Sequence, residues 1–188
     1  MPLPPSFDLL ALQHNQRARY PFLLESVVRA QAPSFDILFG FPQQTLCLDR
    51  GGQLTGPYAA ESADFLTSLD LWWQAEGNTP FDIHPPLEAP FVGGWFVFLG
   101  YELAAQIEPG LQLPLLPAAQ DFPTAFATRI PAAIVIAHSL QQIWIISEQA
   151  ELLPVMCADI QAAVPPISSN LLQVQALWEA DESEFLTA

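Results

Sequence analysis

The sequence predicts an α+β fold in which antiparallel β-sheets stack as a sandwich and helices pack on the outside. Two observations lead to this class. Short apolar or alternating runs recur between turn residues, and two longer segments carry apolar residues at helical spacing. Runs of strands separated by only two helices favour stacked antiparallel sheets with the helices outside them. The nineteen prolines predict long and stiff connections between these elements.

Several segments have the composition of strands. The clearest is 34–41, where Phe35, Ile37, Phe39 and Phe41 share one face. The predicted strands, in chain order, are 7–12, 21–28, 34–41, 45–49, 93–99, 125–137 and 143–147.

Turn residues are expected to connect these strands as antiparallel neighbours. The Arg-Gly-Gly-Gln turn at 50–53 follows the strand at 45–49 and predicts a meander. The turn at 138–142 reverses the chain into a hairpin. Arg129 and Pro131 interrupt the long apolar run before that turn, which predicts a bulge or an edge position there.

The apolar run 90–103 is the longest in the chain and is expected to organise the fold. Its strand at 93–99 is apolar on both faces, with Trp95 on one and Phe96 on the other. A strand of this kind is typical of a central position covered on both sides. A short helix is predicted at 101–106.

Two amphipathic helices are predicted, at 61–76 and 150–164. Ser62 is a candidate N-cap of the first, and Pro154 fits the second only within its first turn. Their apolar stripes consist of Phe65, Leu66, Leu69, Trp72 and Trp73 in the first helix and Leu153, Met156, Cys157, Ile160 and Val164 in the second.

The charge balance excludes two classes of partner. The chain has 20 acidic residues against 5 arginines and no lysine, for a net charge of −15. Nucleic acids and anionic membranes are bound through clustered cations. We therefore expect no nucleic acid and no membrane as partner, and we interpret the scattered acids as a solvated surface.

The location of the protein is predicted from its cysteines and its apolar segments. Cys47 and Cys157 lie far apart in apolar stretches, which indicates two buried free thiols and a reducing compartment. The opening residues Met-Pro-Leu-Pro-Pro lack the pattern of a signal peptide, so none is expected, and no window reaches about 18 uninterrupted apolar residues. We therefore expect a cytoplasmic protein.

The sequence shows no pattern typical of a catalytic site. His14, His84 and His138 are far apart, and none has the spacing of metal ligands. No Gly-x-Ser-x-Gly motif is present. We therefore predict that this chain alone is inactive and carries no metal or cofactor of its own.

Three segments together resemble a known family. They are Pro-Phe-Leu-Leu-Glu-Ser at 21–26, Phe-Asp-Ile-Leu at 35–38, and the stretch from Pro-Phe-Val-Gly-Gly at 90–94 to Gly-Tyr-Glu-Leu at 100–103. In this order they are similar to the N-terminal domain of aminodeoxychorismate synthase component I (para-aminobenzoate synthase component I) and of anthranilate synthase component I. The resemblance covers about residues 7–180. The last of these stretches is more similar to the aminodeoxychorismate enzymes of the folate branch.

The resemblance implies a sandwich of antiparallel sheets with helices outside. It implies a family domain at 1–180 and, at 181–188, the lead-in to an absent C-terminal chorismate-binding domain. That domain would hold chorismate and Mg²⁺ and perform the catalysis. The expected partners are this domain and a glutamine amidotransferase subunit.

The resemblance also implies part of an L-tryptophan pocket. The matching positions are Ser26, Ala32, Pro33, Ser34 and Phe35. Many relatives carry an arginine where this chain has Ser34.

The sequence leaves three hypotheses for the function of this chain. They are a non-catalytic domain of a chorismate-aminating enzyme of either branch, a free-standing amino-acid-binding module, and an interaction protein without a small ligand.

Overall fold

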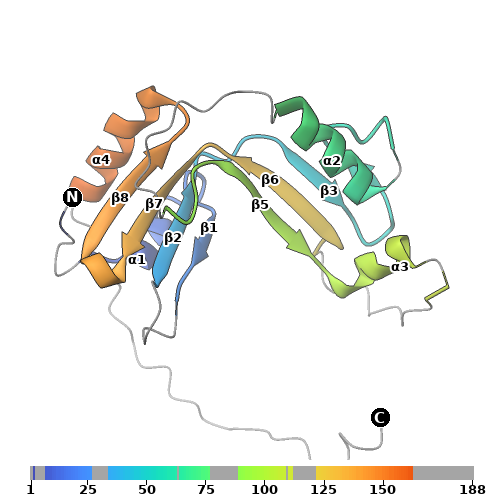
Figure 1. The fold of residues 1–188 in the computed structure, drawn as a ribbon, viewed down its shortest axis with the longest axis horizontal. Helices are drawn as coiled ribbons and strands as arrows, with labels where there is room; N and C mark the ends of the chain where they lie inside the picture. The colour runs from blue at the N-terminus through green and yellow to red at the C-terminus, as the bar shows by residue number, and fades with distance from the viewer. Residues whose placement is uncertain are drawn as a thin grey trace, which may run out of the picture.

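The computed structural model describes residues 2, 7–26, 34–62, 64–76, 89–108, 110–111 and 122–162. These residues form two four-stranded antiparallel sheets that face each other, with helices on their outer sides (Figure 1). This confirms the predicted α+β class.

The first sheet has the strand order β1-β2-β7-β8. The second sheet has the order β4-β3-β6-β5. The strands of the first sheet are β1 (Phe22–Leu24), β2 (Phe35–Gly40), β7 (Ala132–Ala137) and β8 (Gln142–Ser147), and those of the second are β3 (Thr45–Leu48), β4 (Leu54–Thr55), β5 (Gly94–Leu99) and β6 (Ala125–Ile130).

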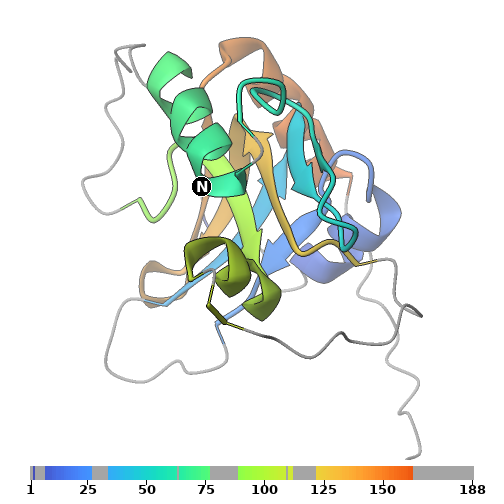
Figure 2. The ribbon, with the colours of Figure 1, turned by 90° about the vertical axis from the view of Figure 1, so that its right-hand side faces the viewer.

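Helices cover the outer face of each sheet. In Figure 1, α1 and α4 flank the first sheet, and α2 lies over the second. Figure 2 looks at the second sheet from outside and shows α2 and α3 in front of its strands. The helices described are α1 (Leu9–Asn15), α2 (Phe65–Glu76), α3 (Ala104–Ile107) and α4 (Leu153–Gln161), with 3₁₀ turns η1 (Tyr101–Leu103), η2 (His138–Leu140) and η3 (Ala150–Leu152).

The fully buried cores lie between each sheet and its helices. In the first, Leu12 of α1 and Met156 of α4 pack on Leu38 and Ile134. In the second sheet, Phe65 and Trp72 of α2 belong to a separate apolar cluster on the outer face. The other buried members of this cluster are Leu46, Leu48, Leu103, Ala125 and Ala127. Each sheet is therefore stabilised chiefly by burial of its own helical layer.

The two inner faces meet through aromatic rings but stay only partly buried. The ring of Phe22 stacks on that of Phe96 with centroids 4.1 Å apart, and Phe39 meets Phe96 edge-on at 5.3 Å. Phe126 is half-buried on the same side, and Leu24 is 50% exposed. Figure 1 shows the sheets spreading apart like an arch. Among the described residues, the sandwich is therefore closed at one end and open at the other.

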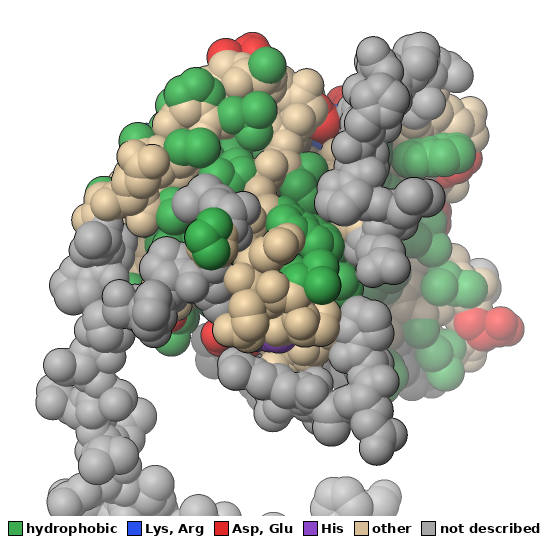
Figure 3. Space-filling model, turned by 60° about the vertical axis from the view of Figure 1, so that its left-hand side comes forward, with side chains coloured by type: hydrophobic (Ala, Val, Ile, Leu, Met, Phe, Trp, Pro, Cys, Tyr) green, Lys and Arg blue, Asp and Glu red, His purple; other side chains and the backbone are tan. Residues whose placement is uncertain are grey.

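Hydrophobic side chains also reach the outer surface. On the face that Figure 3 presents, they form a patch near the centre, and carboxylates lie mainly around the outline. On β5, Val97 is 41% exposed and Leu99 is 52% exposed.

The predicted central position of the strand at 93–99 is wrong. Within the described residues, β5 pairs only with β6 and forms an edge of its sheet. Trp95 packs against α2, but the helix does not cover Val97 and Leu99. The predicted short helix after this strand is confirmed by η1 and α3.

The predicted strand at 7–12 is also wrong, because this segment opens α1. The carboxylate of Asp8 accepts a hydrogen bond from the Leu10 N–H at 2.9 Å and caps the helix. Leu9 and Leu12 then fall on one face and enter the core. The strand predicted at 21–28 shortens to β1, and its last two residues lie outside the described part.

The chain crosses between the sheets at Pro131. It leaves the second sheet after Ile130 and enters the first at Ala132. Both β6 and β7 are interior strands, so the predicted edge position is wrong, although the break falls at the predicted residue. The predicted turn at 50–53 is confirmed, because it joins β3 to its antiparallel neighbour β4. The strands β2 and β3 lie in different sheets, so the meander does not include β2. The hairpin of β7 and β8 is confirmed.

The two predicted amphipathic helices are confirmed, with changed bounds. α2 starts at Phe65, and the Asp64 carboxylate accepts the Thr67 N–H at 2.7 Å, a capping role predicted for Ser62. In α2, Trp73 is 57% exposed, so the predicted stripe is only partly buried. α4 starts at Leu153 with Pro154 in its first turn, as predicted.

The two cysteines are free thiols, as predicted, but both are half-buried and not fully buried as expected. Burial, together with the nearby carboxylate of Asp49, raises the pKa of the Cys47 thiol.

Candidate functional site

The candidate site is a cavity under α1, built around Asp36 of β2. Asp36 faces the outer side of the first sheet because it alternates in register with Leu38, which enters the core below α1 and α4. Asp36 is only 5% exposed, so its carboxylate needs partners within the protein.

Asp36 has partners for both carboxylate oxygens. Oδ1 accepts the backbone N–H of Ser26 at 2.8 Å, and Oδ2 lies 2.7 Å from Nε2 of His138. The backbone N–H of His138 donates to the Ser34 carbonyl at 3.1 Å. The end of β1, the start of β2 and the turn after β7 are thereby fixed around one carboxylate.

The cavity has a volume of about 290 Å³ and a mixed lining. Its lining residues are Phe7, Asp8, Leu9, Glu25, Asp36, Ile136, His138 and Gln141. Three of them are carboxylates, and Phe7, Leu9 and Ile136 supply an apolar wall. This lining suits a small ligand that has an ammonium group and an apolar body.

The cavity is not arranged for nucleophilic catalysis. In the described residues, the His138 ring is hydrogen-bonded to Asp36, and no hydroxyl or thiol hydrogen-bonds to the ring. A triad needs a nucleophile on the other ring nitrogen. Among these residues no group of three or more potential metal ligands comes together either.

The structure places only some of the predicted ligand residues here. Ser26 and Ser34 bond around Asp36 and His138 through their backbones. Phe35 points to the other face of the sheet, where its ring lies 5.8 Å from that of Trp144. Ala32 and Pro33 lie outside the described residues.

Sequence reasoning missed Asp36 and His138 as site residues. The available signal was an acidic residue within an alternating strand, on the same face as the apolar Leu38. A carboxylate in that position is buried and requires a partner. Nothing in the local sequence identified His138 as that partner.

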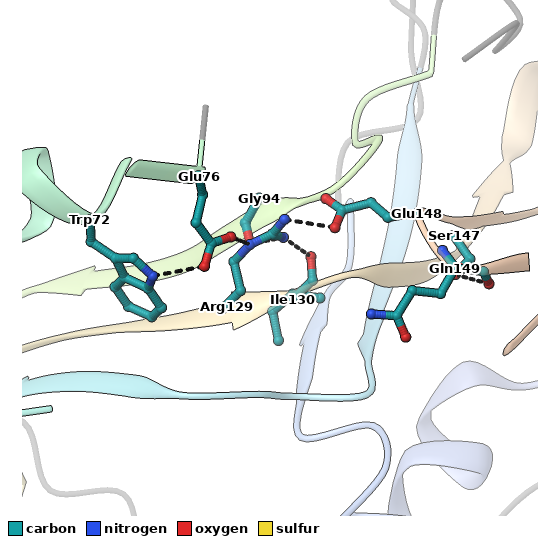
Figure 4. Close-up of polar contacts among 8 residues, drawn as sticks. All are labelled: Trp72, Glu76, Gly94, Arg129, Ile130, Ser147, Glu148 and Gln149. Carbon is teal, nitrogen blue, oxygen red and sulfur yellow. Dashed lines mark hydrogen bonds and ion pairs between the residues drawn. The ribbon is translucent and has the colours of Figure 1, made fainter. Parts of the chain in front are cut away.

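A second buried polar cluster surrounds Arg129 of β6 (Figure 4). Its guanidinium contacts Glu76 at 2.5 Å, Glu148 at 2.6 Å and the Gly94 carbonyl at 3.0 Å. It also lies 4.9 Å from the ring centre of Trp95. Because its partners come from both sheets and α2, we interpret this cluster as a structural junction.

A scan of the chain against protein-family models finds no match, and a search of curated proteins finds none either. In the part of the chain that the structure describes, no helix has both the length and the apolar character needed to cross a membrane.

Proposed function

We propose that this chain is the N-terminal, non-catalytic scaffold domain of a chorismate-aminating enzyme, of the aminodeoxychorismate synthase component I type. In the whole enzyme, a C-terminal domain would bind chorismate and Mg²⁺ and form 4-amino-4-deoxychorismate for folate synthesis. The ammonia would come from a glutamine amidotransferase subunit, and the complex would act in the cytoplasm.

The observation that carries the proposal is the open inner side of the sandwich. Aromatic and aliphatic side chains of both sheets, among them Phe126 and Leu24, stay partly exposed there. Leaving such surface in water costs roughly 25 cal/mol per Å². Exposed apolar patches of this kind mark contact surfaces, and a second domain that covers them would regain this free energy.

The test is complementation by a separately produced catalytic domain. We expect no turnover of chorismate with ammonia and Mg²⁺ by this chain alone, and turnover when the C-terminal domain of an aminodeoxychorismate synthase is added. The product distinguishes the branches, because the tryptophan-branch enzyme would yield anthranilate. Turnover by this chain alone would contradict the proposal.

A matched pair of variants tests which surface is used. Leu24 lies on the open inner side and is 50% exposed, whereas Leu10 lies on α1 and is 46% exposed. We expect Leu24→Asp to prevent association with the catalytic domain and Leu10→Asp to leave it intact. If the two substitutions affect association with the catalytic domain equally, the inner side is not the surface that binds this domain.

The cavity beside Asp36 favours a second candidate function, the binding of an amino acid such as L-tryptophan. Its carboxylates would receive the ammonium group, and Phe7 and Ile136 the apolar side chain. Calorimetry with L-tryptophan tests this function. We expect Glu25→Gln, in the lining, to weaken binding and Glu61→Gln, an exposed control with the same charge change, to have no effect. No heat at millimolar L-tryptophan would exclude it.

A further inference from the structure

A second hollow, of about 540 Å³, opens where the turn after α1 meets the end of β2. Its walls carry the guanidinium groups of Arg17 and Arg19, the side-chain amides of Asn15 and Gln16, and the rings of Phe41 and Pro42. It shares no residue with the cavity beside Asp36.

The charge of this hollow is opposite to that of the chain. The protein has 20 acidic residues and 5 arginines, yet the lining contains two arginines and no carboxylate. Such a local excess of cations favours an anionic ligand. The C-terminal end of α1 carries a partial negative charge that opposes an anion, but this effect is worth only about 0.3–1 kcal/mol at an exposed site.

The two arginines have different surroundings. Nη1 of Arg19 donates to both oxygens of Asp159 at 2.8 and 2.7 Å, so its charge is largely neutralised. Arg17 is exposed and has no hydrogen bond or ion pair with the described residues. Arg17 therefore remains available to a ligand, with its five N–H donors suited to a carboxylate.

The apolar wall is held in an unusual backbone conformation. Phe41 has φ of +59°, which a bulky residue rarely adopts. Its N–H donates to the Arg19 carbonyl at 2.7 Å, and its ring meets that of Tyr20 edge-on at 5.9 Å. Strain of this kind persists where the surroundings fix it, often in binding sites. The ring of Phe41 is thereby held as a rigid wall of the hollow that Arg17 also lines, with the Arg19 guanidinium 5.7 Å from the ring centre.

We infer that this hollow binds a small organic anion that combines a carboxylate with a flat apolar ring. Arg17 takes the carboxylate, the amide of Asn15 adds a hydrogen bond, and the ring lies against Phe41 and Pro42. This site goes beyond the proposed scaffold role and uses none of its surfaces.

The test is calorimetric titration with benzoate, with inorganic phosphate and benzylamine as comparison probes. We expect benzoate to bind with a dissociation constant near 1 mM, about −4 kcal/mol. Phosphate, which lacks the ring, and benzylamine, which has the opposite charge, should bind at least roughly tenfold more weakly.

Two arginine variants provide the matched control. Arg17→Ala should weaken benzoate binding by about two- to fivefold, the upper part of the range of an exposed charge pair. Arg50→Ala removes the same charge from an exposed site outside the hollow and should leave binding unchanged. The thermal unfolding midpoint of both variants should lie within a few degrees of that of the parent protein.

Four results would overturn the inference. They are no heat with benzoate at about ten times the expected dissociation constant, equal losses in Arg17→Ala and Arg50→Ala, phosphate as tight as benzoate, and benzylamine as tight as benzoate. The absence of heat would show that the hollow does not bind benzoate. Equal losses in the two variants would exclude Arg17 as the binding residue. Tight phosphate binding would exclude the ring contact, and tight benzylamine binding would exclude the preference for an anion.

Discussion

Arg129 in β6 and Glu148, directly after β8, join the two sheets. Nη2 of Arg129 donates to Oε2 of Glu148 at 2.6 Å, and both side chains are about nine-tenths buried. Burial by itself would lower the pKa of Arg129, but hydrogen bonds and charge attraction from Glu148 and Glu76 outweigh it and raise that pKa. The guanidinium therefore stays charged at the junction.

Replacing Arg129 should destabilise the fold strongly. Arg129→Met leaves Glu148 as a buried carboxylate without its cation, which costs about 3–5 kcal/mol. Urea unfolding followed by tryptophan fluorescence measures the loss. Arg17→Ala, on an exposed arginine that has no hydrogen bond or ion pair with the described residues, should change stability by less than about 0.5 kcal/mol. A loss below about 1 kcal/mol for Arg129→Met would contradict the structural role of this pair.

Gly93 should be intolerant of a side chain. It has φ of +125°, and a Cβ there would lie 1.8 Å from Oε1 of Glu148. Gly93→Ala combines backbone strain of about 1–3 kcal/mol with displacement of the Arg129 partner. Gly110→Ala is the control, because no atom of the described residues beyond its chain neighbours lies within 4 Å of its would-be Cβ. Thermal unfolding should give a clearly lower midpoint for Gly93→Ala alone, and equal midpoints would refute the predicted contact.

Because of Tyr20, the free energy of unfolding should decrease at alkaline pH. Its hydroxyl donates to Asp159 at 2.7 Å, and burial, followed by this carboxylate, raises the pKa of the phenol far above its ordinary value. The folded protein thus holds the proton more tightly than the unfolded chain. The stability from this proton is complete below about pH 10 and is lost as the pH rises further.

The variant Tyr20→Phe tests this. It should lose about 1.5–3 kcal/mol at neutral pH, the range for a hydrogen bond to a charged group. Above about pH 10, its stability should fall less steeply than that of the parent protein, measured by urea unfolding at several pH values. Parallel curves would show that the Tyr20 proton is not linked to folding.

Asp36 should stabilise the fold through the hydrogen bonds of its carboxylate beside the cavity. Asp36→Ala leaves the Ser26 N–H and the His138 ring without this acceptor, which costs about 1–3 kcal/mol. Asp36→Asn keeps one amide oxygen as acceptor and should cost less. Thermal unfolding measures both. If Asp36→Asn is as destabilising as Asp36→Ala, hydrogen bonding is not what Asp36 contributes.

Local patterns in the sequence determined several elements of this protein. The alternation of Phe35, Ile37 and Phe39 predicted β2, because a strand repeats its faces every two residues. The spacing of Met156 and Ile160 predicted α4, because residues four apart lie on the same face of a helix. Pro154 located the first turn of this helix. The turn at 138–142 predicted the hairpin of β7 and β8.

Only the tertiary structure decided which surfaces those elements share. The apolar run around Trp95 looked central but became the edge strand β5, because α2 covers one end of it and β6 pairs on one side. Asp36 and His138 are 102 residues apart and meet only through the pairing of β2 with β7. Sequence periodicity records which face of an element is apolar, whereas the choice of neighbour depends on how all the elements pack together.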